Sequence, residues 1–249
     1  RGRTSKPLRG FAAAAVSVMV HNLSSSQAGE YGLHPSSKLN ELFAGAEFPH
    51  QGQDPHSASI IFIGLDANYS SELSSIVTFF PYILEYHNDE VAFWKKYGVH
   101  HPFLLDEYPL KRNTGGVPYH NNFAKMRLDS SYAHRISFIE LIPHPTTGRT
   151  EEATFWSLFD ASHAARIDAL MYEGKRKLII LSSSVMRKME KAKRSLGVFQ
   201  WLPESFRIGE MKKIEQTIIF GAPHFSSAVK NEALLRLGED IREFSRNAP

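Results

Sequence analysis

Four short runs of apolar and β-branched residues, each bounded by turn-forming residues, recur along the chain. They are Ser-Ile-Ile-Phe-Ile at 59–63, Arg-Ile-Ser-Phe-Ile at 135–139, Lys-Leu-Ile-Ile-Leu at 177–181 and Gln-Thr-Ile-Ile-Phe at 216–220. Three of the runs are almost continuously apolar, which is typical of strands buried on both faces of a parallel sheet. We therefore predict four β-strands at these positions.

Helical spacing of apolar residues appears between these runs. The pattern predicts helices over 153–172, 184–196 and 229–244, a shorter one over 90–97, and one that starts near Lys38 after a turn or cap at His34-Pro35-Ser36. Strands that alternate with helices form βαβ units with right-handed crossovers. The sequence thus predicts an α/β fold with a mostly parallel sheet.

The chain divides into two parts at about residue 57. We expect residues 1–57 to form an N-terminal helix at 11–22 and a largely irregular segment that packs on the core, and residues 58–249 to form the α/β domain. The gap from 64 to 134 is too long for one crossover helix, so it holds extra helices and an irregular or functional loop, with an insertion at about 70–113. No apolar run reaches 18 residues, so we expect no membrane span.

The amino-acid composition excludes several kinds of chemistry. The 249 residues include no cysteine, which excludes disulfides, thiolate nucleophiles, cysteine-bound zinc and iron–sulfur clusters. Net charge is +3 and the pI is about 9.0, a weak indication of a polyanionic partner. Basic residues concentrate at 175–177, 187–194 and 212–213. A solvated helix face or loop is the better explanation of any single run.

Polar residues follow the predicted strands directly. In a parallel sheet, ligands bind beyond the carboxyl ends of the strands. Asp66 follows the first strand, Glu140 the second and His224 the fourth. Taken singly, the aspartate fits a helix N-cap, the glutamate a surface ion pair and the histidine an ordinary loop position. Their agreement on one edge of one sheet favours a functional site.

Two other site types fit the sequence less well. The serines at 182–184 follow the third strand, but no Gly-x-Ser-x-Gly turn surrounds them, so a helix cap explains them better than a nucleophile. No chelating histidine pair lies at the strand ends. We expect neither a metal nor another cofactor.

The order of motifs resembles that of the uracil-DNA glycosylase superfamily, and most closely its single-strand-selective monofunctional branch. The resemblance covers about residues 58–246 and rests on five motifs. They are Gly64-Leu65-Asp66, Thr114-Gly115-Gly116-Val117-Pro118-Tyr119, Glu140 with Pro143, Gly148-Arg149 and His224-Phe225-Ser226. It implies a three-layer sandwich around a central, mostly parallel four-stranded sheet.

Three positions depart from the family pattern. Glu140 stands where the family has an asparagine that reads the uracil edge, and Phe225 stands where the last motif has proline. Ala67-Asn68 replaces the residues that shape the pocket floor. An amide donates and accepts hydrogen bonds, whereas an ionised carboxylate only accepts them and repels O4 of uracil. The carboxylate favours a base with two donors, and its protonated form favours cytosine or adenine. A modified, amine-bearing base is as plausible a target as uracil, and a retired site also fits.

The resemblance implies a DNA base-excision glycosylase that hydrolyses the N-glycosidic bond of a flipped uracil or other modified base. It assigns Asp66 and His224 to catalysis; Gly64, Leu65, Asn68, Tyr119 and Glu140 to base binding; and Ser182, Ser183, Ser226 and Ser227 to DNA phosphates. We expect a monomer that acts on single- or double-stranded DNA, in the cytoplasm at the nucleoid or in the nucleus. Two alternatives stay open. They are a non-catalytic nucleic-acid-binding protein and a hydrolase of nucleosides or other small glycosides.

Overall fold

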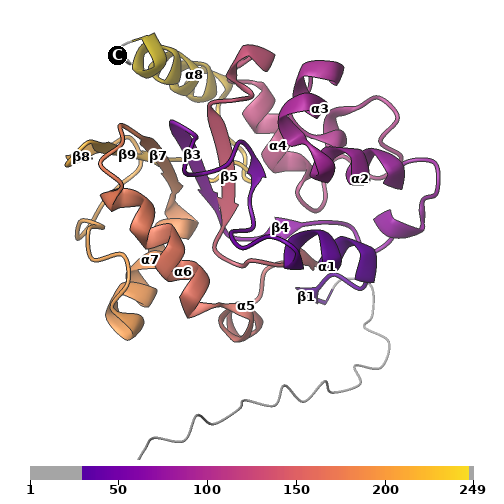
Figure 1. The fold of residues 1–249 in the computed structure, drawn as a ribbon, viewed down its shortest axis with the longest axis horizontal. Helices are drawn as coiled ribbons and strands as arrows, with labels where there is room; N and C mark the ends of the chain where they lie inside the picture. The colour runs from indigo at the N-terminus through magenta and orange to yellow at the C-terminus, as the bar shows by residue number, and fades with distance from the viewer. Residues whose placement is uncertain (1–29, 247–249) are drawn as a thin grey trace, which may run out of the picture.

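A six-stranded sheet forms the centre of the fold (Figure 1). The structure is a computed structural model that describes residues 30–246. The strands β5 (Ile136–Glu140), β3 (Ile60–Gly64), β7 (Leu178–Ser182) and β9 (Thr217–Ala222) are parallel and adjacent in this order. The edge strands β2 (Gln51–Gly52) and β8 (Met211–Ile214) are antiparallel to their neighbours. The chain is therefore mixed α/β, as predicted.

The prediction of four strands identified the parallel part of the sheet and missed its edges. Each parallel strand begins one residue later than predicted. The sheet has six strands instead of the expected four, because β2 and β8 each add a strand at one side. β2 has only two residues, and three of the four residues of β8 are exposed. Neither edge strand carries the buried apolar run on which the prediction depended.

Helices cover both faces of the sheet because strand residues alternate between two cores. Ile61 and Ile63 of β3 pack with residues of α5 (Glu152–Leu158), α6 (Ala161–Ala169) and α7 (Ser183–Leu196). Ile60 and Phe62 pack on the opposite side with residues of α4 (Val117–Ala124) and α8 (Asn231–Arg246). Each such fully buried side chain stabilises the fold by about 1.5–3 kcal/mol.

The long gap between β3 and β5 holds helices, as expected. Here α2 (Phe80–Asn88) and α3 (Glu90–Tyr97) pack with α1 (Ser37–Ala44) around a third apolar cluster. The Ser36 hydroxyl accepts a hydrogen bond from the Leu39 amide, which confirms the predicted cap. Short 3-10 turns lie at Leu73–Ser75, Pro102–Leu104, Ser130–Tyr132 and Leu170–Tyr172. No helix within residues 30–246 is long and apolar enough to cross a membrane.

The single helix predicted over 153–172 is wrong. It is divided into α5, α6 and a 3-10 turn, because Asp160 accepts a hydrogen bond from the amide of His163 and starts a new helix. The helices predicted at 184–196 and 229–244 correspond to α7 and α8, with ends that differ by one or two residues. The helix predicted at 11–22 lies outside the described residues.

A small second sheet lies beyond the carboxyl ends of β3 and β5 (Figure 1). Its strands β1 (Gly32–Leu33), β6 (Pro145–Thr147) and β4 (Ala67–Asn68) are adjacent in that order. Residues that are far apart in the sequence meet in this sheet. It brings Tyr31 and β1 next to the segments that follow β3 and β5, which carry the predicted site.

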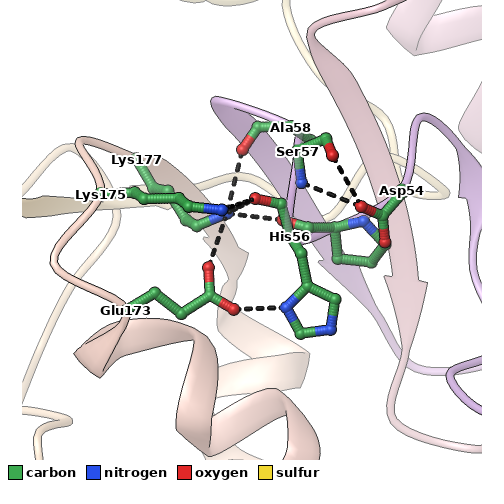
Figure 2. A network of polar contacts seen from close by, with 8 residues as sticks. Asp54, His56, Ser57, Ala58, Glu173, Lys175 and Lys177 are labelled. Carbon is green, nitrogen blue, oxygen red and sulfur yellow. Dashed lines mark hydrogen bonds and ion pairs between the residues drawn. The ribbon is translucent and has the colours of Figure 1, made fainter.

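A buried lysine connects the segments that lie before β3 and β7, at the amino ends of the parallel strands (Figure 2). The side chain of Lys177 is 0% exposed, and its ammonium donates hydrogen bonds to the carbonyls of Pro55 and Ala58 at 2.5 and 3.1 Å. It also forms an ion pair with Glu173 at 3.3 Å. Burial lowers the pKa of Lys177, and Glu173 acts in the opposite direction. The charge is thus matched by acceptors on several sides.

Candidate functional site

The site lies where the chain order of the parallel strands reverses. The chain passes from β3 to its neighbour β5 on one side, and later from β7 to β9 on the other. The segments after β3 and β7 therefore diverge, and such a switch point leaves a crevice at the carboxyl ends of the strands. The loops that follow β3 and β9 carry Asp66 and His224, and Glu140 is the last residue of β5.

Asp66 lies in the loop between β3 and β4 and caps no helix. Its carboxylate accepts a hydrogen bond from the Thr146 hydroxyl. Asn68 in turn donates to the Thr146 hydroxyl at 3.2 Å and to the Gly148 carbonyl at 2.9 Å. Burial raises the pKa of Asp66, while Thr146, the Tyr31 hydroxyl, Asn68 and the charge of His224 act to lower it. The Asn68 side chain therefore fixes the position of the segment that carries Asp66, and its contact with a base stays a prediction.

Tyr31 is a site residue that the sequence did not indicate. It is only 6% exposed, and its buried hydroxyl has no hydrogen-bond partner within residues 30–246. Burial raises the pKa of Tyr31, and the charges of Asp66 and Glu140 raise it further. An unpaired buried hydroxyl is rare and costly. This one lies beside two carboxylates at the candidate site.

Glu140 lies opposite Gly64 in the parallel register of β5 and β3. A Cβ atom at Gly64 would be 2.0 Å from Oε2 of Glu140, so the carboxyl group lies over the glycine and would have to move to admit a larger residue there. The side chain makes no hydrogen bond or ion pair with residues 30–246 in the structure. Burial, and then the charge of Asp66, raise the pKa of Glu140 well above its usual value. The surroundings thus favour its neutral, protonated form.

His224 is positioned with its Nε2–H available to donate. Its Nδ1 accepts a hydrogen bond from the Ser226 amide at 3.2 Å. The proton of the neutral ring is then on Nε2. Burial lowers the pKa of His224, Asp66 raises it, and the charge of Arg187 lowers it. At neutral pH the ring is therefore a neutral hydrogen-bond donor close to Asp66.

The loop that carries His224 is fixed to α4 by Asn122, another residue that the sequence did not indicate. Its buried amide donates to the carbonyls of Phe225 and Ser227 at 2.6 and 3.1 Å. The hydroxyl of Ser227 donates to the His224 carbonyl at 2.6 Å, and Ser226 is exposed. Of the two serines in this loop that were predicted to contact phosphate, Ser227 thus forms a hydrogen bond within the loop.

Tyr119 lies near the other site residues, beside a very small cavity. Its ring packs against Phe225, with centroids 5.2 Å apart, and the charge of Glu140 helps to raise its pKa after the larger effect of burial. The adjoining cavity has a volume of about 10 Å³ and is lined by Phe62, Ile63, Tyr119, Ile180, Ser182, Ala222, Pro223 and Phe225. That volume holds about one water molecule. A base does not fit this cavity as the structure describes it.

The remaining predicted residues occupy separate places around the crevice. Ser182 is the N-cap of α7, where its hydroxyl accepts from the Val185 amide at 3.4 Å, and Ser183 is the first residue of that helix. The cap interpretation of this serine segment is confirmed. Leu65 packs partly against the apolar core between the sheet and α5–α7. It faces a groove on that side rather than Tyr119.

Three buried histidines form a cluster, and one of them, His120, packs against the Tyr119 ring with centroids 5.3 Å apart. His100 and His120 are hydrogen-bonded through Nε2 and Nδ1 at 3.0 Å, and the His101 ring stacks on His120 with centroids 3.7 Å apart. Burial lowers the pKa of His120 to about 3, so the ring stays neutral. Within the part of the chain that the structure describes, no group of histidine and acidic side chains is arranged to hold a metal ion.

No protein-family model matches the sequence, and no curated protein sequence matches it. The function is therefore argued from the geometry of the site.

Proposed function

We propose that the protein is a monofunctional DNA glycosylase that removes a flipped base by hydrolysis. The observation that carries this proposal is the combination of a carboxylate, Asp66, with a neutral histidine donor, His224, at the switch point of a parallel sheet. The order of motifs that resembles the uracil-DNA glycosylase superfamily also supports it. The three-layer glycosylase fold is part of the same proposal.

The two residues fit the two charges that develop when an N-glycosidic bond breaks. Positive charge forms on the sugar, and negative charge forms on the leaving base. Asp66 is suited to stabilise the sugar cation and to take a proton from the attacking water, whose oxygen bonds to the anomeric carbon. The electron pair of the broken bond leaves with the base, and Nε2–H of His224 donates to an oxygen of that base. Tyr119 would stack on the base.

The small cavity beside Tyr119 favours a second candidate, a nucleic-acid-binding protein without catalysis. Flipping requires a pocket that encloses the base, and about 10 Å³ does not enclose one. The candidates differ in one respect that an assay detects, since only a glycosylase leaves an abasic site.

The test is incubation with labelled oligonucleotides that carry different single bases, followed by alkali cleavage. We expect cleavage at one or a few base types, and a loss of at least about 100-fold for Asp66→Asn, because a positioned general base contributes about 10²–10⁴-fold. Cleavage by neither protein, with DNA binding intact, would establish the non-catalytic alternative. Equal cleavage by both would show that Asp66 is not the catalytic base.

A further inference from the structure

A basic groove lies between α5 and α7, next to the carboxyl end of β3. It has a volume of about 360 Å³, and the residues that matter here are Leu65, Glu152, Ser184, Arg187, Lys188 and Lys191. We refer to it as the α5–α7 groove. Three cations and one carboxylate give it a net charge of +2. Its size is within the range of ligand sites.

The cations of the groove differ in how far they are neutralised. Glu152 forms ion pairs with both lysines, to Lys191 at 3.1 Å, and Lys191 also lies over the Trp156 ring at 4.6 Å. Hydrogen bonds from Lys188, Trp156 and Lys191 lower the pKa of Glu152 to about 2, so it is charged at neutral pH. Arg187 is exposed and makes no hydrogen bond or ion pair within residues 30–246 of the structure. Its guanidinium is therefore available to an anion.

The groove adjoins the candidate catalytic site. Leu65, which lines it, is the residue before Asp66. The charge of Arg187 also acts on His224, which places the guanidinium within electrostatic reach of the imidazole. Two segments that are distant in sequence therefore connect the groove to the crevice. An anionic group held by Arg187 would lie next to whatever occupies the site.

The charge pattern of α7 favours a polyanion over a single small anion. The helix carries five basic residues and one acidic residue. A basic stripe along one helix is the electrostatic footprint of a nucleic-acid partner. Arginine suits phosphate because its planar guanidinium donates two parallel hydrogen bonds to the phosphate oxygens.

We propose that the α5–α7 groove binds the phosphodiester backbone of a single DNA strand beside the nucleotide in the site. Arg187 is the principal phosphate ligand, and Glu152 competes with the phosphates for Lys188 and Lys191. This assignment rests on the proposed function for the identity of the polyanion. It adds a phosphate-binding surface to the predicted phosphate contacts of Ser182, Ser183 and the serines of the His224 loop.

The experiment measures binding of a fluorescein-labelled oligothymidylate of about 15 nucleotides, a length that covers one binding site, by anisotropy at several salt concentrations. We expect Arg187→Gln to weaken binding at low salt by about 3- to 10-fold and to reduce the salt slope by about 0.7, the value for one single-strand phosphate contact. Glu152→Gln should change affinity in the opposite direction and tighten binding. Arg236→Gln is the matched control, because Arg236 is an exposed arginine on α8, which covers the other face of the sheet.

Equal effects of Arg187→Gln and Arg236→Gln would overturn the proposal, and so would weaker binding by Glu152→Gln or no binding by the wild type at low salt. The alkali-cleavage assay on the same proteins, at saturating protein, judges the catalytic proposal separately. Binding changes of the expected signs without base removal would leave the groove in place and refute the glycosylase. Base removal with unchanged binding would refute only the groove.

Discussion

Replacement of Tyr31 by phenylalanine removes the unpaired hydroxyl beside Asp66 and leaves the ring in place. The hydroxyl is one of the groups that lower the pKa of Asp66 against the larger effect of burial. A well-formed hydrogen bond to a charged group contributes about 1.5–3 kcal/mol. The Tyr31 contact lacks hydrogen-bond geometry, so we expect about 1 kcal/mol, below that range. Because about 1.4 kcal/mol corresponds to a tenfold change in an equilibrium constant, Tyr31→Phe should raise the pKa of Asp66 and favour its protonated form about fivefold.

The expected effect is confined to acidic pH. In the proposed mechanism Asp66 is ionised when it activates water, so the rate of base removal should fall as pH decreases through its pKa. Tyr31→Phe should move this fall to higher pH and lower the rate about fivefold at acidic pH, with no change at pH values well above the pKa of Asp66. Tyr172→Phe is the control, because Tyr172 is 54% exposed.

The assay is the pH dependence of single-turnover base removal, together with urea unfolding of each variant. Loss of an unpaired buried hydroxyl should leave the free energy of unfolding unchanged or higher. Thr146→Val, which removes a formed hydrogen bond to Asp66, should shift the fall in rate further in the same direction. A shift with Thr146→Val and none with Tyr31→Phe would show that Tyr31 does not stabilise the carboxylate.

Three further changes test other parts of the structure. Burial keeps Glu140 protonated to a higher pH than usual, and only the protonated form donates a hydrogen bond. Wild-type uracil removal should therefore fall as pH rises through the raised pKa of Glu140, and Glu140→Asn should abolish that fall, because an amide donates at every pH. Wild-type uracil removal that stays constant as pH rises, and is unchanged by Glu140→Asn, would show that Glu140 is not in the base pocket. Asn122→Ala leaves two carbonyls unpaired, so the free energy of unfolding should fall by about 1–3 kcal/mol. The backbone amides of 225–227 should then exchange hydrogen faster, and an unchanged exchange rate would contradict the role of Asn122 in the loop. Lys177→Met should lower the free energy of unfolding in urea by about 3–5 kcal/mol. The control is Lys175→Met, at an exposed neighbour with one hydrogen bond, which should lower it by under about 1 kcal/mol. Similar losses would show that the buried network does not stabilise the fold.

The parallel strands were predictable because a strand buried on both faces appears in the sequence as a short apolar run. Edge strands lack that signature, and Lys212 and Lys213 in β8 make its exposed character plain. The helix prediction failed at Asp160 for a different reason. Apolar spacing continues across 153–172, and one aspartate whose side chain accepts from the His163 amide ends that continuity. The boundary between the two helices thus depends on a local cap, which apolar periodicity alone does not reveal.

The strand-end residues of the site were predictable from topology, because parallel strands present their carboxyl ends on one edge. The positions of Tyr31 and Thr146 beside Asp66 were not predictable. The two residues meet Asp66 through a sheet whose strands have two or three residues each, too short for any pattern to reveal. Asn122 was missed because its partners are more than 100 residues away in sequence.

The two ends of the parallel strands differ in how their buried ionisable groups are paired, and this difference supports the choice of the site. At the amino ends, Lys177 is surrounded by carbonyl oxygens and by Glu173, so its charge is satisfied. At the carboxyl ends, Glu140 has no partner within residues 30–246, and its pKa is raised by burial and by Asp66. The Tyr31 hydroxyl beside it is also unpaired. A fold gains no stability from two neighbouring carboxyl groups without a cation, since each disfavours ionisation of the other. Such a costly arrangement is typical of catalytic and binding sites. The unsatisfied end is therefore the one at which a ligand would supply the missing partners.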